Sequence, residues 1–408
     1  MINNNTTYKD SPLGKIPVDW EVMTLKDCCL IKGEYGINAA AVEYSEELPT
    51  YIRITDIDDD GNYSGIKKVS VNDENSGNFL LSDGDIVFAR TGATVGKTYL
   101  YDSKDGELVF AGFLIRFRPN EEFLIPQHLK YFASTNLYWN WIKTVSMRSG
   151  QPGINVEEYG SIKIPIPPLP EQKAIAHILG LVDSAISTNN QLIVKKELQK
   201  KWLMQNLLTG KKRLKGYCDE SNKLGAGEIF KSVSVKGFEN EELLSATQDK
   251  GIIPRSMLEG RVTMPTNGTE SYKLVEPGDF VVSLRSFQGG LEYSYYKGIV
   301  SPAYTILKPK KKINDEFYKQ YFKSNDFISH LAIAVIGIRD GKQISYDDFC
   351  TLRIPYPSLE EQTTIAQVLF AADKEIQLLK AKTEKLREQK KGLMQVLLTG
   401  KKRLTIKL

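Results

Sequence analysis

The sequence predicts an α+β protein in which two strand-rich globular pieces alternate with two long helices. A 51-residue segment occurs twice, an apolar stripe of helical period runs through each copy, and short alternating strands precede each copy. Residues 164–214 and 354–404 align without a gap at an offset of 190, and 26 of the 51 positions are identical. The repeat predicts four segments, globular at 1–163 and 216–353 and helical at 164–215 and 354–408.

The second copy of the repeat has the pattern of a long helix. Its apolar stripe is spaced alternately by four and three residues, which is the heptad pattern of a helix packed on another helix. Eight of these ten positions are apolar: Ile365, Leu369, Ala372, Ile376, Leu379, Thr383, Leu386, Lys390, Leu393 and Leu397. Ser358 and Glu361 form a capping-box pattern, so we expect the helix to begin near residue 359. Gly400 suits the left-handed residue that ends a helix.

The first copy keeps the same stripe, with Pro170 in the first turn and Gly210 at the end. We expect the two helices to pair antiparallel as a coiled coil, which would give a pseudo-twofold symmetric chain. Polar residues interrupt both stripes more often than two-helix packing requires. They are therefore predicted to contact partner proteins: Asn189, Lys196, Lys200, Thr383 and Lys390.

The globular pieces share an outline and differ in content. In the first, strands are expected at 51–54, 85–89, 97–101 and 114–117, followed by a helix at 127–145 and a polar loop at 147–155. In the second, residues 277–285 resemble 83–90, a helix is expected at 316–335, and a polar loop follows at 337–345. This contrast indicates a common scaffold that carries two different recognition surfaces.

The composition excludes several classes of protein. The 408 residues are 41% hydrophobic and 25% charged with a net charge of +4, which is ordinary for a folded protein that tolerates a polyanionic partner. No apolar run is long enough to span a membrane, and the N-terminus lacks a secretory signal, so we expect a cytoplasmic protein. The four cysteines and three histidines match no disulfide or metal pattern, so neither metal nor cofactor is expected.

Residues 92–98 resemble a phosphate-binding P-loop but fail its requirements. Three residues separate the two glycines where the motif needs four, and a strand rather than a helix is expected to follow. We found no methyl-donor loop and no nuclease cluster elsewhere. A chain of this size without catalytic motifs is predicted to be a binding or assembly module.

The repeated segments carry a resemblance to a known family. The segments Pro-Pro-Leu-Pro-Glu-Gln at 167–172 and Pro-Ser-Leu-Glu-Glu-Gln at 357–362 open the two helices, and Leu-Leu-Thr-Gly-Lys-Lys-Arg-Leu closes both. The stretches at 84–92 and 284–289 also carry the resemblance. With these motifs the chain resembles a specificity subunit of a type I restriction–modification system, over nearly its whole length.

This resemblance implies a division of labour. Each globular piece would be a target-recognition domain for one half of an interrupted double-stranded DNA sequence, and the helices would set the gap between the half-sites. Two adenine methyltransferase subunits, and in the full system motor and nuclease subunits, would dock on the chain. The chain itself would be non-catalytic and would bind no methyl donor.

Loop residues with donor geometry suited to base edges or phosphates are the candidates for DNA contact. In the first half they are Arg90, Thr91, Lys97, Arg148, Ser149 and Gln151, and in the second Arg285, Ser286, Gln288, Arg339, Lys342 and Gln343. Arg90 and Arg285 stand at strand ends, where a structural ion pair or cap is an equal alternative. The competing interpretation of the whole chain is a coiled-coil adaptor whose basic helices bind only acidic proteins.

Overall fold

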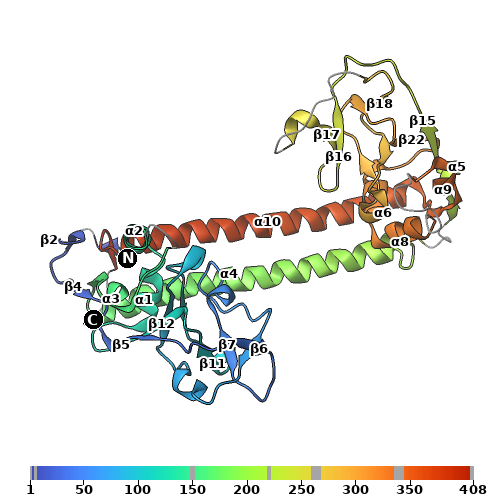
Figure 1. The fold of residues 1–408 in the computed structure, drawn as a ribbon. Helices are drawn as coiled ribbons and strands as arrows, with labels where there is room; N and C mark the ends of the chain where they lie inside the picture. Colours follow the sequence, from blue (N-terminus) through green and yellow to red (C-terminus); the bar gives the residue numbers. More distant parts are fainter. Residues whose placement is uncertain are drawn as a thin grey trace. The chain divides into compact units, whose positions relative to one another are not determined.

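The computed structural model describes residues 2–3, 7–147, 152–217, 222–258, 268–334 and 344–404. The chain divides into two compact units, one made of Met1–Asn189 with Lys382–Leu408 and the other of Asn190–Ala381 (Figure 1). The second unit is contiguous in sequence, whereas the first combines both ends of the chain. Each contains one globular piece and parts of both long helices.

The globular part of the first unit has three short helices, α1 (Pro126–Phe132), α2 (Asn136–Val145) and α3 (Val156–Gly160). Its main sheet has the strand order β10-β9-β12-β5, and a second four-stranded sheet has the order β11-β7-β8-β6. Three smaller pairings, β13 with β4, β2 with β3 and β1 with β24, complete it. The strands are β1 (Ile2–Asn3), β2 (Tyr8–Ser11), β3 (Gly14–Pro17), β4 (Glu21–Thr24), β5 (Cys29–Tyr35), β6 (Ala41–Glu43), β7 (Thr50–Ile52), β8 (Val69–Val71), β9 (Ile86–Ala89), β10 (Thr98–Leu100), β11 (Leu108–Phe110), β12 (Leu114–Pro119), β13 (Lys163–Ile166) and β24 (Arg403–Leu404).

Strand β9 lies at the centre of this unit and is buried along its whole length. Because side chains alternate across a strand, Ile86 and Phe88 pack in the core beneath the helices, while Val87 and Ala89 pack in the core shared with β7 and β11. The main sheet is therefore covered on both faces. The buried strand therefore fixes the position at which the following turn begins.

The second unit repeats this plan with a sheet of order β15-β22-β19-β20. Its helices are α5 (Ala226–Ile229), α6 (Ser286–Gly289), α7 (Asp315–Phe322), α8 (Asn325–Ala334) and α9 (Tyr346–Thr351). Pairs form between β14 and β23, β16 and β17, and β18 and β21. The strands are β14 (Lys223–Gly225), β15 (Phe230–Val233), β16 (Leu244–Thr247), β17 (Gly251–Pro254), β18 (Lys273–Val275), β19 (Phe280–Val282), β20 (Glu292–Tyr293), β21 (Gly298–Val300), β22 (Thr305–Pro309) and β23 (Arg353–Pro355).

The central strand of this second sheet, β19, is also buried on both faces. Phe280 and Val282 face the helical core, and Val281 faces the smaller cluster with Ile306. The two units thus share the order of their main sheet strand for strand, as the repeated outline in the sequence predicts.

The single helix expected in each globular piece is wrong in one respect, because each region forms two helices. In the first unit the Thr135 hydroxyl accepts a hydrogen bond from the amide of Tyr138 and begins a new helix. In the second unit Ser324 does the same for Phe327. A side-chain oxygen that satisfies free amides at a helix start favours such a break.

The long helices are α4 (Leu169–Leu203), continued by a π-helical turn at Met204–Leu208, and α10 (Leu359–Leu397). The start at Leu359 confirms the predicted helix start, and the Glu361 amide donates to the Ser358 hydroxyl at 3.3 Å, while the Glu361 carboxylate binds Arg213. Gly210 and Gly400 follow the two ends with positive φ, as expected for helix-terminating glycines.

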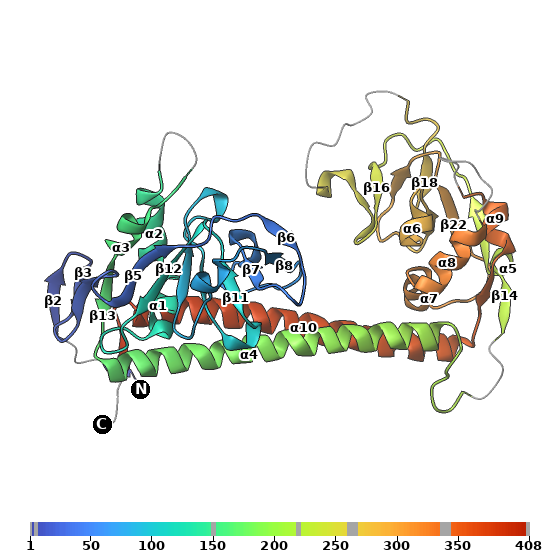
Figure 2. The same ribbon diagram turned by 60° about the horizontal axis from the view of Figure 1, so that its bottom comes forward.

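Within each unit, a stretch of α4 lies alongside an oppositely directed stretch of α10 (Figure 2). In the first unit Ile175 and Leu179 pack with Leu397 in one apolar cluster. In the second unit Leu207 joins Ile365 and Leu369 in the main core. The antiparallel coiled coil predicted from the heptads is confirmed.

The ends of the two repeat copies are joined crosswise. The Arg403 guanidinium binds the carboxylate of Glu171, with nitrogen–oxygen distances of 3.1 and 2.6 Å, and also binds Asp19. Arg213 binds Glu361 in the same way. Both glutamates are buried. The last arginine of each copy therefore neutralises the glutamate that directly precedes the shared glutamine of the other copy, Glu171 or Glu361.

We expect Arg403→Met to lower the free energy of unfolding by about 3–5 kcal/mol, because it leaves the buried Glu171 carboxylate without its cation. Trp20 would still donate its indole N–H to Glu171, at 3.0 Å. Urea denaturation followed by tryptophan fluorescence measures the change. The matched control is Arg387→Met, which removes a solvent-exposed pair with Glu384 and should cost less than about 1 kcal/mol. Equal losses in the two variants would contradict the proposed role of the buried pair.

Candidate functional site

In the first unit the turn after β9 and the loop after α2 are held together by backbone hydrogen bonds. The Ile154 amide donates to the Arg90 carbonyl at 2.9 Å, and the Gly92 amide donates to the Pro152 carbonyl at 3.0 Å. Thr91 also forms a bridge with Gly153. The turn that carries the candidates Arg90 and Thr91 therefore lies beside residues 152–154, at the end of the predicted polar loop. Arg148, Ser149 and Gln151 lie outside the described residues.

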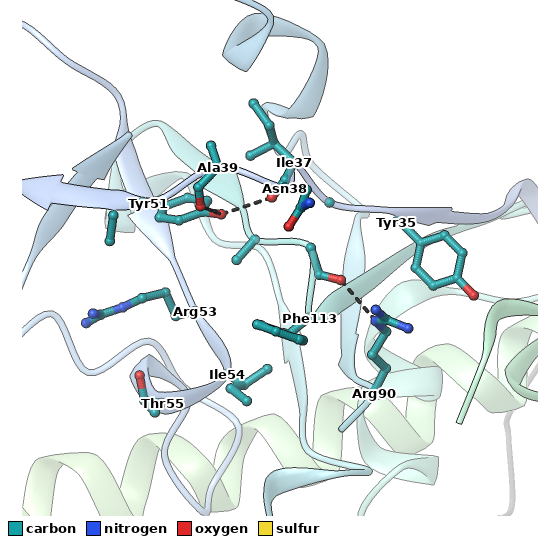
Figure 3. A pocket seen from close by; sticks show the side chains of 14 residues that line it. Tyr35, Ile37, Asn38, Ala39, Tyr51, Arg53, Ile54, Thr55, Arg90 and Phe113 are labelled. Carbon is teal, nitrogen blue, oxygen red and sulfur yellow. Dashed lines mark hydrogen bonds between the residues drawn. The ribbon is translucent and has the colours of Figure 1, made fainter. Parts of the chain in front are cut away.

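Arg90 is half-buried and contacts two aromatic rings. Its Nε donates to the Gly112 carbonyl at 3.0 Å, and its guanidinium lies 4.8 Å from the ring centroid of Tyr35 and 5.9 Å from that of Phe113. These contacts fix the arginine at the wall of a pocket of about 680 Å³ (Figure 3). The Arg90 side chain thus stabilises the fold through its hydrogen bond to Gly112 and also lines the pocket.

Lys97 ends the same turn with its charge already paired. Its ammonium lies 2.7 Å from an oxygen of Asp59, and hydrogen bonding to Lys97 lowers the pKa of that carboxyl. The turn between Arg90 and Lys97 contains the short 3₁₀ segment Gly92–Thr94 and leads into strand β10, as the rejection of a P-loop predicts. A DNA contact by Lys97 stays a prediction.

In the second unit the turn after β19 folds as the short helix α6. Arg285 and Gln288 are exposed there, while Ser286 is fully buried. The Ser286 hydroxyl accepts a hydrogen bond from the Ser283 amide at 2.9 Å. Ser286 therefore stabilises the turn, and its DNA contact stays a prediction that its burial disfavours. Arg285 and Gln288 remain the open candidates on this turn.

Both turns are anchored by another side chain, Tyr138 of α2 in the first unit and Lys323 just after α7 in the second, which the sequence patterns did not indicate. In the first unit the Tyr138 hydroxyl donates to the Gly96 carbonyl at 2.7 Å. In the second unit the Lys323 ammonium donates to the Gly289 carbonyl at 3.0 Å and pairs with the buried Glu292 at 2.7 Å. Burial raises the pKa of Glu292, and Lys323 opposes that shift.

The loop that follows α8 carries the remaining candidates, Arg339, Lys342 and Gln343, all outside the described residues. Immediately after this loop, Ile344 is buried in the main core of the second unit. The Ser345 hydroxyl accepts from the Asp348 amide at 3.0 Å and begins α9. The exit of the loop is therefore fixed in the second unit.

The five residues predicted to contact partners each bind the other long helix. Asn189 donates to Thr383 at 2.7 Å within the buried seam. Three lysines form ion pairs of 2.6–2.8 Å, namely Lys196 with Glu375, Lys200 with Asp373 and Lys390 with Asp183. These contacts account for the polar residues in the seam without a partner protein. Their role in docking stays a prediction.

Metal ligation and membrane insertion have no support in the part of the chain that the structure describes. No group of His, Cys, Asp and Glu side chains there could hold a metal ion. Likewise, none of the described helices is long and apolar enough to cross a membrane. Cys28, Cys29 and Cys350 are free thiols, and burial raises the pKa of Cys28 to about 12.

Two segments, residues 17–198 and 226–388, match the family described as the type I restriction modification DNA specificity domain. The chain belongs to this family, and each match covers one globular piece with most of one long helix. The putative type I restriction enzyme MjaX specificity subunit of Methanocaldococcus jannaschii is 29% identical, over 97% of this chain and 96% of that protein. The resemblance noted in the sequence is thus confirmed at the level of the family.

Solved structures show the same fold. The HsdS subunit from Thermoanaerobacter tengcongensis superposes with a TM-score of 0.55 at 18% identity, covering 96% of this chain and all of that one. A chain from a structural study of complex assembly in the type I R-M system reaches a TM-score of 0.60 at 17% identity, covering 95% and 99%.

The α6 turn should depend on the glycine that ends it. Gly290 has φ of +76°, and an added Cβ would lie 1.8 Å from the Phe322 carbonyl oxygen. Gly278→Ala is the matched control, because that glycine also has positive φ, +100°, but open space around it. We expect Gly290→Ala to destabilise the protein by about 1–3 kcal/mol more than the control, measured by urea denaturation. Equal midpoints would mean that the turn relaxes around the methyl group.

Proposed function

We propose that this chain is the DNA-recognition subunit of a type I restriction–modification complex and reads an interrupted double-stranded sequence. The observation that carries this proposal is the duplication of a family-matched recognition piece within one chain. Two unlike pieces on one scaffold suit a target with two unlike half-sites. The chain supplies recognition, and methyl transfer and cleavage belong to its partner subunits.

The recognition domains in this proposal are residues 1–163 and 216–353. Each presents one turn that follows the buried central strand, because a rigid strand end positions a side chain better than a loose loop does. On the first turn Arg90 and Thr91 are the leading candidates, and on the second Arg285 and Gln288. Arginine and glutamine side chains can form paired hydrogen bonds with guanine and adenine edges, respectively.

The long helices, within residues 164–215 and 354–408, set the gap between half-sites and bind partners. Two adenine methyltransferase subunits would dock, one for each half-site, with motor and nuclease subunits added in the full system. The outer face of α4 offers an apolar stripe of exposed side chains, Val194, Leu198 and Trp202. The equivalent positions of α10 are Glu384, Glu388 and Gly392. The two docking faces are therefore chemically different.

A coiled-coil adaptor that binds only proteins is the competing function. Its main support was the density of lysines on both helices. Several of these lysines form ion pairs within the chain, which leaves less positive charge for an acidic partner. The family match also favours DNA recognition.

A gel-shift assay separates the two functions. The chain is mixed with its methyltransferase partner and a duplex that contains a site obtained by mapping methylated adenines in the source genome. We expect specific binding. The logarithm of the association constant should fall linearly with the logarithm of the salt concentration, because phosphate contacts release counterions. A scrambled duplex of equal length is the control. Assembly of the two proteins without any DNA preference would contradict the proposal and favour the adaptor.

The Arg285→Ala variant tests base reading at the α6 turn. We expect it to lose discrimination at one base pair of one half-site, by about 1–3 kcal/mol, while the other half-site is read as before. Competition binding with duplexes that carry every single-base change in the target measures the loss. The control is Arg353→Ala, an exposed arginine in strand β23 of the same unit. A uniform loss on all DNA would make Arg285 a phosphate contact instead.

A further inference from the structure

The pocket beside Arg90 is lined by exposed aromatic side chains and by charged side chains that the packing of the core does not require. Phe113 is 55% exposed and Tyr35 is 39% exposed, although both line a concave surface. Its other walls come from the β5–β6 connection, strand β7 and the segment after it. Figure 3 shows Phe113 between Arg90 on one side and Arg53 on the other. Two exposed aromatic rings and two guanidinium groups therefore meet in one hollow.

We propose that this pocket holds a single nucleobase that has rotated out of the bound duplex. The proposal rests on the DNA-binding function proposed above and adds a site to it. The pocket volume of about 680 Å³ falls in the range of roughly 300–1,000 Å³ that is usual for small-molecule sites. Every base has a flat face that stacks on an aromatic ring, so Phe113 accepts a base of any identity.

Polar groups for the edge of a base surround the aromatic platform. The exposed Asn38 side chain, which carries both a donor and an acceptor, lies above Phe113 in Figure 3. Thr55 adds a hydroxyl from the opposite wall. Arg90 uses its Nε for the Gly112 carbonyl, and its terminal nitrogens are additional donors at the rim. A base that stacks on Phe113 can therefore be hydrogen-bonded at its edge.

The Arg53 guanidinium is more fully paired within the chain than that of Arg90. Its guanidinium makes two bonds to the Asp56 carboxylate, at 2.9 and 2.8 Å, and these contacts raise the pKa of Arg53. The pairing fixes the arginine at the pocket edge but neutralises much of its charge. Stacking, rather than attraction to a phosphate, is therefore the main binding force expected here.

The pocket is joined to the segments that are proposed to touch DNA. The Tyr35 hydroxyl accepts a hydrogen bond from the Val156 amide at 3.2 Å, just after the loop that follows α2. Arg90 belongs both to the pocket and to the turn that is bonded to Pro152 and Ile154. A duplex bound by this turn and loop would lie next to the pocket mouth. This placement favours a base extruded from DNA over a free nucleotide.

The test uses the full chain and duplexes with no target site, each paired throughout or carrying one unpaired extra adenine, cytosine, guanine or thymine nucleotide. An unpaired base costs less to unstack, so stacking in the pocket appears directly as added affinity. We expect at least one bulged duplex to bind about 10-fold more tightly than the paired duplex, in line with the free energy of base–aromatic stacking. Phe113→Ala should abolish this preference without changing affinity for paired DNA.

Two further variants separate stacking from damage to the fold. Phe113→Tyr keeps an aromatic ring and should keep the preference. Phe123→Ala removes another exposed phenylalanine of the same unit, one that is not part of the pocket, and should also keep it. A bulge preference that survives Phe113→Ala, or its absence from the native chain, overturns the pocket proposal.

A free-nucleotide arm tests the source of the base. Each deoxynucleoside monophosphate is titrated into the chain by calorimetry, and only weak binding is expected. Saturable binding of a monophosphate without a bulge preference would overturn the extruded-base assignment. Specific binding of the mapped target without a bulge preference would overturn the pocket proposal alone. Failure to bind any DNA even with the methyltransferase partner present would overturn the proposed function as well.

Discussion

Two buried ion pairs, Arg403 with Glu171 and Arg213 with Glu361, hold the rest of the structure in place. Each joins the end of one repeat copy to the beginning of the other, where a long helix leaves a globular piece. A buried carboxylate is costly unless a cation neutralises it, so neither end of a helix is stable without its counterpart.

Further paired contacts involve residues that are identical in the two copies of the repeat. Asp183 pairs with Lys390 in the first unit, and their equivalents Asp373 and Lys200 pair in the second. Gln172 and Gln362 likewise each accept a hydrogen bond from the backbone amide just before a helix, Gln172 before α1 and Gln362 before α7. The repeated positions that form these contacts are the same in both copies, whereas the recognition turns have diverged. A scaffold used twice can thus carry two independent readers.

The helices and main strands were predictable because their signals are local. Heptad spacing, the Ser358 cap and the alternation around β9 each depend on a few neighbouring residues. The breaks at Thr135 and Ser324 were missed because a single hydroxyl decides them within an otherwise helical pattern.

The site was less predictable, because its residues meet only after the chain folds. Arg90 was identified from its turn, but its contacts with Tyr35 and Phe113 depend on three segments that are distant in the sequence. In the sequence of one helix, the lysines and the asparagine of the seam had no evident partner. Their hydrogen-bond and ion-pair partners lie on the other helix. Such partners cannot be assigned from one helix alone.

The way in which the chain is shared between its units has a consequence for synthesis. The second unit is one contiguous stretch, Asn190–Ala381, while the first needs the final segment, Lys382–Leu408. Strand β24 in that segment pairs with β1 at the very beginning of the chain. During translation the second unit therefore has all of its residues before the first one does. An N-terminal unit that needs a segment from beyond the second unit departs from the arrangement that suits the usual N-terminal-first order of folding.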